Sequence, residues 1–276
     1  MARVFAMNRP HIDGHRVRRQ FSRHAGDYDA YAVVQKRVVE GLLERLRQTG
    51  SLTGPVLEVG TGTGLLGQKI AEEYGQLPLV LSDIAQGMTR HAARMVPQGM
   101  AVDADAQNLP FRAQTFGLLL SSSMYQWVND LPRAFAESVR VLQPGGRFLF
   151  ALFGERTLYE LRDSHRQAVA EVGCRQPSHA QEFPTRAEVQ LALRTAGFAV
   201  SHIEMTTEVE YHADVSQLLR GLKKIGAQNA TGAAPAGFSS RRVMQRMMEL
   251  YRQRYGEPGR IPASYEVIYG MAVTPR

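Results

Sequence analysis

The sequence predicts an α/β protein with a mostly parallel sheet of seven strands, an antiparallel last strand and helices on both faces. Three observations support this prediction. Short apolar runs alternate with helical stretches through most of the 276 residues, as in successive βαβ units. A glycine-rich turn, Gly60 to Gly64, joins the first apolar run to a helix. An acid stands at or just after the end of each of the first three runs, namely Glu58, Asp83 and Asp105.

The chain is predicted to begin with a loose basic tail over residues 1–19. The first 24 residues contain six arginines and a single acid, and they lack the apolar core of a secretory signal. A helix is predicted over residues 20–48, because apolar residues recur at helical spacing from Phe21 to Leu46. The stretch Thr49–Pro55, with its glycine and proline, ends this helix.

Seven apolar or β-branched runs are predicted as strands. They are Val56–Val59, Leu79–Ser82, Met100–Val102, Leu118–Leu120, Arg147–Leu152, His202–Tyr211 and Tyr265–Val273. Two helical patterns, Val215–Ile225 and Arg241–Tyr255, lie between the last two runs, joined by Gln228–Gly237. We expect these helices to form a lid over about residues 212–260, within a single domain that covers residues 20–276.

The net charge of +7 predicts an acidic protein partner or a small anionic substrate. No RNA-binding signature accompanies the charge, so we expect no nucleic-acid partner. No apolar run approaches the ~18 to 20 residues that span a bilayer, so we expect no membrane partner. Cys174 is the only cysteine and the histidines lie at no metal-ligand spacing, which argues against a disulfide framework and a bound metal and suits a reducing cytoplasm. The oligomeric state is left open.

The turn from Gly60 to Gly64 lets a ligand approach the backbone closely. Gly62-x-Gly64-x-x-Gly67 also matches the dinucleotide-binding fingerprint, with Asp83 where a ribose-binding acid belongs. Glu58 distinguishes the two interpretations, since dinucleotide-binding folds usually carry an apolar residue there and a carboxylate would repel the pyrophosphate.

The three acids suit a cationic ligand that carries adenosine and no phosphate. Glu58 can accept hydrogen bonds around a sulfonium amino acid, directly or through water. Asp83 can accept from both ribose hydroxyls, and Asp105 from an adenine amino group. Because they follow successive strands of a parallel sheet, we expect them to meet at one edge of it.

Four motifs between Val56 and Leu152 resemble those of the class I S-adenosylmethionine methyltransferases. They are Glu58-Val59-Gly60-x-Gly62-x-Gly64, Ser82-Asp83-Ile84, Asp105-Ala106 with Leu109-Pro110-Phe111, and Leu142-Gln143-Pro144-Gly145-Gly146. One departure is Gly117 after Phe116, where the family often has an acid. The resemblance implies a Rossmann-like class I methyltransferase fold with S-adenosyl-L-methionine as the cofactor. It also implies cofactor contacts from Gly60, Gly62, Ile84, Met88, Ala106 and Ser121.

The flanking segments resemble the malonyl-acyl-carrier-protein O-methyltransferases of biotin synthesis, so that the resemblance covers about residues 18 to 274. They are Phe21-Ser22-Arg23, Tyr28, Gln126-Trp127, Leu158-x-Glu160-Leu161, Leu222-Lys223-x-Ile225-Gly226-Ala227 and Ile261-Pro262-x-x-Tyr265. The resemblance implies methylation of the free carboxylate of a malonyl thioester on an acidic acyl-carrier protein. The choice between carrier protein and coenzyme A stays open.

Substrate roles are expected for four residues outside the cofactor motifs. Arg220 could grip a carboxylate through paired hydrogen bonds, and Lys223 lies one helical turn away. Tyr28 could close over the transferred methyl group, and Trp127 could form a wall of the pocket. Three other functions are weighed: methylation of a small isoprenoid or aromatic acceptor, methylation of RNA, and the non-methylating activity of arginine-hydroxylating respiratory assembly factors, which this family also resembles.

Overall fold

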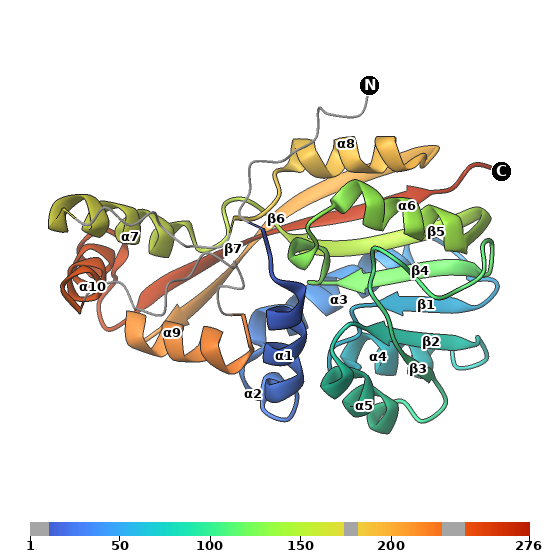
Figure 1. Ribbon diagram of the computed structural model, residues 1–276, viewed down its shortest axis with the longest axis horizontal. Helices are drawn as coiled ribbons and strands as arrows, with labels where there is room; N and C mark the ends of the chain where they lie inside the picture. The colour runs from blue at the N-terminus through green and yellow to red at the C-terminus, as the bar shows by residue number, and fades with distance from the viewer. Residues whose placement is uncertain (1–10, 174–181, 228–240) are drawn as a thin grey trace.

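A computed structural model describes residues 11–173, 182–227 and 241–276. Its centre is a seven-stranded sheet with the order β3-β2-β1-β4-β5-β7-β6 (Figure 1). The strands are β1 (Val56–Val59), β2 (Leu79–Asp83), β3 (Met100–Asp103), β4 (Phe116–Ser122), β5 (Leu142–Phe153), β6 (Val200–His212) and β7 (Ile261–Val273). β1 has the predicted bounds, and each of the other six strands is longer than predicted at one end or at both.

The direction of the strands confirms the predicted fold class. β1 to β5 pair with one another in parallel, whereas β7 runs antiparallel to both β5 and β6. The strand order reverses between β1 and β4, and the carboxyl ends of these two parallel strands lie side by side. In open α/β sheets, ligands bind at such a point.

Helices cover both faces of the sheet. They are α1 (Gly14–His24), α2 (Tyr28–Tyr31), α3 (Val33–Arg47), α4 (Leu65–Glu73), α5 (Gln86–Met95), the short 3₁₀ helix η1 (Tyr125–Trp127), α6 (Leu131–Val141), α7 (Tyr159–Val172), α8 (Arg186–Ala196), α9 (Val215–Lys224) and α10 (Arg241–Tyr255). α3, α4 and α5 contribute to one apolar core, and α6 and α8 to the core on the opposite face. None of the helices in the described ranges has the length and hydropathy needed to cross a membrane.

The helix predicted over residues 20–48 is wrong as a single element, because the structure divides it into α1, α2 and α3. α1 begins inside the predicted tail, at Gly14, where the side chain of Asp13 accepts hydrogen bonds from the first free backbone N–H groups. It ends before Gly26, a residue that lowers helical stability. A second break falls at Ala32, whose ψ of 49° lies outside the helical range. Residues 1–10 of the predicted tail lie outside the described residues.

Beyond the end of β5, β6 and β7 continue as a two-stranded ribbon toward α7, α9 and α10 (Figure 1). α9 and α10 follow the two predicted helical patterns closely. The predicted connection Gln228–Gly237 lies outside the described residues. The ribbon brings α9 to the same side of the molecule as α1 and α2, and so places two chain segments about 200 residues apart beside one site.

Candidate functional site

The glycine turn after β1 is tied to the end of β2. Gly60 has a φ of 78°, and a Cβ atom at this position would lie 2.2 Å from Cγ of Met124. Only glycine therefore suits both the backbone and the space. The N–H of Gly62 donates to Oδ2 of Asp83 at 3.0 Å, and the N–H of Ala85 donates to Oδ1 at 2.8 Å. These bonds hold the turn and the carboxylate in one arrangement.

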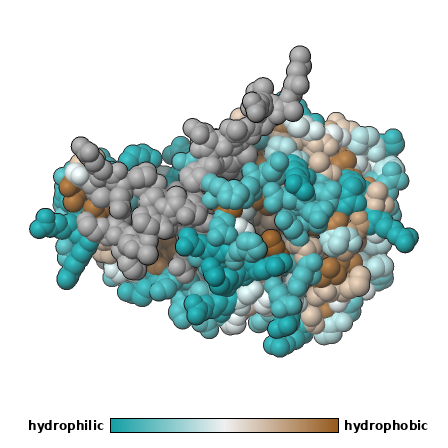
Figure 2. Space-filling view, in the orientation of Figure 1, coloured by the Kyte–Doolittle hydropathy of each residue, from teal (hydrophilic) through white to brown (hydrophobic). Residues whose placement is uncertain are grey.

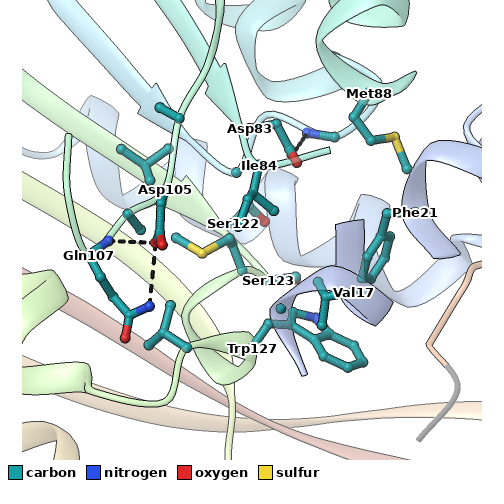
Figure 3. Close-up of a pocket in the computed structure, with 18 of the residues that line it drawn as sticks. Val17, Phe21, Asp83, Ile84, Met88, Asp105, Gln107, Ser122, Ser123 and Trp127 are labelled. Atoms are coloured by element: carbon teal, nitrogen blue, oxygen red, sulfur yellow. Dashed lines mark hydrogen bonds between the residues drawn. The ribbon is translucent and has the colours of Figure 1, made fainter. Parts of the chain in front are cut away.

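A pocket opens at the carboxyl ends of the parallel strands, and we call it the strand-end pocket (Figure 3). The predicted cofactor residues that line it are Gly60, Gly62, Asp83, Ile84, Met88, Asp105 and Ala106. Hydrophilic residues of α1 stand beside a hollow in which apolar residues are visible (Figure 2). Asp83 and Asp105 are the charged groups among the described lining residues, which include no lysine, arginine or histidine. Such a lining favours a cation over a phosphate.

Asp83 is held in an environment that penalises its charge. Burial raises its pKa to about 6, although the N–H groups of Ala85 and Gly62 act in the opposite direction. Asp105 accepts from the backbone N–H of Gln107 at 2.9 Å, which turns the chain after β3 toward the pocket (Figure 3). Both carboxylates keep lone pairs for a ligand.

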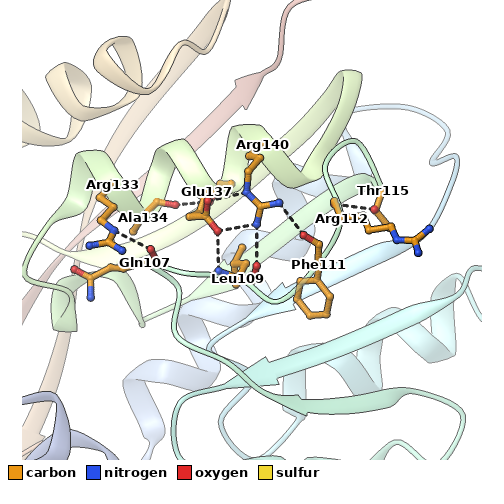
Figure 4. A network of polar contacts seen from close by, with 10 residues as sticks. Gln107, Leu109, Phe111, Arg112, Thr115, Arg133, Ala134, Glu137 and Arg140 are labelled. Carbon is orange, nitrogen blue, oxygen red and sulfur yellow. Dashed lines mark hydrogen bonds and ion pairs between the residues drawn. The ribbon is translucent and has the colours of Figure 1, made fainter.

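An ion pair on α6 fixes the segment that carries Asp105 (Figure 4). Glu137 and Arg140 are 2.7 Å apart, and Glu137 accepts from the N–H of Leu109 at 2.7 Å. Arg140 donates to the carbonyl oxygens of Leu109 and Phe111 at 2.8 and 2.7 Å. These bonds hold the Leu109-Pro110-Phe111 motif against α6. Glu137 and Arg140 thus position the loop that carries Asp105, although neither lines the strand-end pocket.

Glu58 lies in a separate small cavity beneath the glycine turn, which we call the turn cavity. Its side chain is 2% exposed, and its Oε2 accepts from the hydroxyl of Thr61 at 3.0 Å. Burial raises the pKa of Glu58 to about 8, against the opposing effect of the Thr61 hydrogen bond. The turn cavity shares Tyr28, Gly60 and Gly62 with the strand-end pocket, so a cation in that pocket would stabilise the ionised form of Glu58.

Ser121 does not line the strand-end pocket as predicted. Its side chain is fully buried in β4, where its backbone pairs with Phe150. Ser122 and Ser123, which follow it, line the pocket instead. Successive side chains alternate across a strand, and a motif resemblance does not resolve such a difference of one residue.

A second cavity, the chamber, adjoins the strand-end pocket and shares Phe21, Tyr28, Ser123 and Trp127 with it. Its other described lining residues are Gln35, Gln126, Phe153, Thr157, Leu158, Phe183, Leu222, Ile225, Ala227 and Tyr265. Among these there is no carboxylate, imidazole, amine, guanidinium or thiol. Tyr28 and Trp127 therefore lie at the junction of two cavities. Burial raises the pKa of Tyr28 far above its usual range, so its hydroxyl stays neutral.

Arg220 and Lys223 line neither of these cavities but a third, larger and more open one, the basin. The basin shares Gln35, Leu222, Ile225 and Tyr265 with the chamber. Arg23 and Lys224 also line it, and Lys224 pairs with Asp27 at 3.2 Å. Arg220 and Lys223 are exposed. The structure thus separates the predicted anion-binding residues from the predicted cofactor residues by an uncharged chamber.

Several lining residues were missed in the sequence. Val17 and Phe21 come from α1, which is attached over the strand-end pocket by a hydrogen bond of 2.8 Å from Arg18 Nε to the carbonyl oxygen of Ile84. Their spacing of four residues on a helix was a usable signal. Gln107, Ser123 and Asn129 lie in loops, where no periodic pattern marks them.

Comparison with known proteins agrees with this geometry. Residues 57–150 match the methyltransferase domain family. A malonyl-[acyl-carrier protein] O-methyltransferase of Geobacter sulfurreducens is 46% identical over 266 residues, which cover 94% of this chain and 98% of the relative. The chain belongs to the malonyl-[acyl-carrier protein] O-methyltransferase family. It is an S-adenosylmethionine-dependent methyltransferase, as predicted, and S-adenosylmethionine is its cofactor.

Two further likenesses place this methyltransferase more widely. The biotin biosynthesis bifunctional protein BioHC of Saccharophagus degradans is 32% identical over 91% of this chain, which spans 45% of that protein. A phosphoethanolamine N-methyltransferase 2 of Haemonchus contortus, solved in complex with S-adenosylhomocysteine, has the same fold with a TM-score of 0.54 at 18% identity, covering 86% of this chain and 53% of that one. The predicted Rossmann-like class I fold is confirmed.

Proposed function

We propose that this methyltransferase methylates the free carboxylate of a malonyl thioester carried on an acyl-carrier protein, an early step of biotin synthesis in the cytoplasm. The observation that carries the proposal is the uncharged chamber, in which no described residue could act as a general base at neutral pH. An alcohol or amine acceptor must lose a proton around the time of methyl transfer. A carboxylate titrates near pH ~4 and is already a nucleophile at neutral pH.

The strand-end pocket is proposed to hold the cofactor through the predicted acids. Asp83 accepts from the ribose hydroxyls, Asp105 accepts from the adenine amino group, and Glu58 acts from beneath the turn on the sulfonium amino acid. When bound, S-adenosylmethionine supplies a methyl group on a positively charged sulfur, which leaves as a neutral thioether when an acceptor oxygen takes the methyl carbon. Gly60, Gly62, Ile84, Met88 and Ala106 shape the wall around it.

The chamber is proposed to receive the malonyl group. A negative oxygen and a positive sulfur both lose charge as they react, so an apolar lining that excludes water favours the reaction. Phe21, Trp127 and Leu222 provide such a lining, and Tyr28 closes the junction with the strand-end pocket. We propose α9 and α10 as the lid that keeps water out of the chamber.

Arg220, with Lys223 beside it, is proposed to recognise the anionic substrate from the basin. A guanidinium inside the chamber would bind the carboxylate strongly in the ground state, and such binding does not accelerate the transfer. A cation at the entrance attracts the substrate while the chamber beyond stays free of charge.

Mass spectrometry of malonyl-carrier protein incubated with this chain and S-adenosylmethionine tests the proposal. The expected product is heavier by one methyl group in place of a proton. Succinyl-carrier protein and acetyl-carrier protein are the controls, and the latter should stay unmodified because it has no free carboxylate. An unmodified malonyl group, together with methylation of a quinol or hydroxylation of a protein arginine, would contradict the proposal.

A further inference from the structure

Ser123 occupies an unusual position between the cavities of this enzyme. It lines the strand-end pocket, the chamber and the turn cavity, as Tyr28 does. If the cofactor occupies the strand-end pocket and the acceptor enters through the chamber, the reacting atoms meet at the residues common to both. Figure 3 shows Ser123 at this junction, between Ser122 and Trp127.

The backbone of Ser123 is held in a strained conformation. Its φ of 56° lies in the left-handed region, which among the described non-glycine residues is adopted also by Gln114 and Leu158. Leu158 lines the same chamber. Glycine would adopt this φ without strain, so the hydroxymethyl group of Ser123 is kept at an energetic cost. Strain of this kind concentrates at functional sites.

Two hydrogen bonds impose this conformation. The N–H of Ser123 donates to the carbonyl oxygen of Ala151 at 2.8 Å, and its own carbonyl oxygen accepts from Nε2 of Gln126 at 2.6 Å. The amide of Gln126 also accepts from the N–H of Phe153, so that Ser123 is tied to β5 at both ends. The backbone groups are therefore satisfied and cannot turn to meet a substrate.

Unlike the backbone groups of Ser123, its hydroxyl is not hydrogen-bonded within the described residues, and its oxygen is buried. A buried polar group without a partner is costly, and in a site it indicates a missing ligand. The hydroxyls of Ser121 and Ser122 are unpartnered too, but neither residue lines the chamber.

We infer that the Ser123 hydroxyl is a substrate-binding donor, which holds the acceptor carboxylate through the oxygen that does not attack the methyl group. The inference rests on the proposed function. A neutral hydroxyl orients a carboxylate without adding the ground-state stabilisation of a cation. Ser123 keeps its proton throughout, because the reaction requires no proton transfer. The residue thus selects an anionic acceptor in a chamber that has no charged residue in its described lining.

Three variants test the inference. Ser123→Ala and Ser123→Gly should each lower kcat/KM for malonyl-carrier protein by about 10- to 100-fold, the effect of losing one hydrogen bond to a charged group. The glycine variant also relieves the backbone strain, so it keeps its fold if the alanine variant does not. Ser123→Asn, which tolerates the left-handed φ and can donate a hydrogen bond, should retain more activity than Ser123→Ala.

The readout that separates binding of the carboxylate from a structural role is product inhibition. The methyl ester of malonyl-carrier protein has no anionic carboxylate, so its inhibition constant should change by less than about threefold in Ser123→Ala and Ser123→Gly, as should the Kd for S-adenosylmethionine. Ser164→Ala, which removes a buried and unpartnered hydroxyl on α7 away from the cavities, is the matched control and should be fully active.

Either of two results would overturn the inference while leaving the proposed function intact: full activity of Ser123→Ala and Ser123→Gly, or an equal loss of affinity for the substrate and its methyl ester. Absence of malonyl methylation by the unaltered enzyme would instead contradict the proposed function itself.

Discussion

The two halves of the site are built on opposite principles. The cofactor half takes its acids from one continuous stretch of chain, with Glu58 in the turn cavity and Asp83 and Asp105 in the strand-end pocket. The chamber is assembled from residues far apart in the chain, from Phe21 on α1 to Tyr265 on β7, and its described lining carries no charged residue. On the proposed function, the cationic cofactor is recognised by nearby acids, whereas the acceptor carboxylate reacts in a chamber whose described lining carries no charge and excludes water.

The largest expected effect comes from placing a charge in the chamber. Leu222 lines both the chamber and the basin, and Leu222→Asp would put a carboxylate beside the incoming malonyl group. Two like charges about 5 Å apart at an effective dielectric constant of about 20 repel by about 3 kcal/mol, so kcat/KM should fall on the order of 100-fold. Leu222→Asn, similar in size and neutral, is the matched control. Equal activity of the two variants would show that the chamber does not receive an anion.

The next effect concerns the acids of the strand-end pocket. Asp83→Ala should weaken binding of S-adenosylmethionine by about 10- to 100-fold, because a hydrogen bond to a carboxylate contributes on the order of 1.5 to 3 kcal/mol. Isothermal titration calorimetry gives the affinity, and Asp163→Ala, which removes an acid paired with Arg166 on α7, is the control. If Asp83→Ala binds S-adenosylmethionine with unchanged affinity, the acids of the strand-end pocket do not explain recognition of the cofactor.

The raised pKa of Glu58, about 8, predicts how stability depends on pH in the absence of cofactor. Between its ordinary pKa near 4.5 and about 8, the folded state retains a proton that the unfolded state has lost. The free energy of unfolding should therefore fall as pH rises through this window, by about 2 kcal/mol between pH 6 and 8, and level off above it. Because the pKa of Asp83 is also raised, to about 6, this residue lowers the free energy of unfolding further as pH rises to about 6.

Chemical denaturation at several pH values measures this dependence. Glu58→Gln should abolish most of the decline between pH 6 and 8, whereas the exposed substitution Glu72→Gln should leave it unchanged. The same slope in all three proteins would mean that Glu58 is ionised in the folded protein.

A smaller effect is expected from the basin. Arg220→Ala should raise KM for malonyl-carrier protein by about tenfold with little change in cofactor affinity, because an exposed cation contributes less than a buried one. Arg220→Lys should restore part of the loss, since an ammonium lacks the planar fork of the guanidinium. Arg252→Ala removes an exposed arginine of α10 outside the basin and should have no effect. If both alanine variants behave alike, Arg220 has no specific role.

The smallest effect is the salt dependence of recognition. Exposed charges are screened over about 8 Å at physiological ionic strength, so KM for carrier-bound substrate should rise a few-fold with added salt. KM for a short malonyl thioester should barely change, because only the carrier protein is large enough to contact the basic surface of the basin. If KM for the two substrates rises equally with salt, the positive surface has no part in substrate recognition.

The strand and turn motifs from Val56 to Asp105 were predicted well because their signals are local. A strand, a glycine turn and an acid lie within a few residues of one another, and parallel pairing then brings Asp83 and Asp105 to the same edge of the sheet. Errors arose where one residue decides the outcome. The break at Gly26 and Ala32 divides the first predicted helix, and the alternation of side chains in β4 exchanges Ser121 for Ser122.

The sequence by itself determined the fold class, the cofactor and the charge of its site, because these depend on periodicity and on motifs of adjacent residues. Only the tertiary structure decided what surrounds the acceptor. Phe21, Ser123 and Tyr265 meet in the chamber although they lie far apart in the chain, and the ribbon of β6 and β7 sets the distance between α9 and the strand ends. No local pattern records that Arg220 stands outside the chamber or that the Ser123 hydroxyl lacks a partner, since both follow from packing between distant segments.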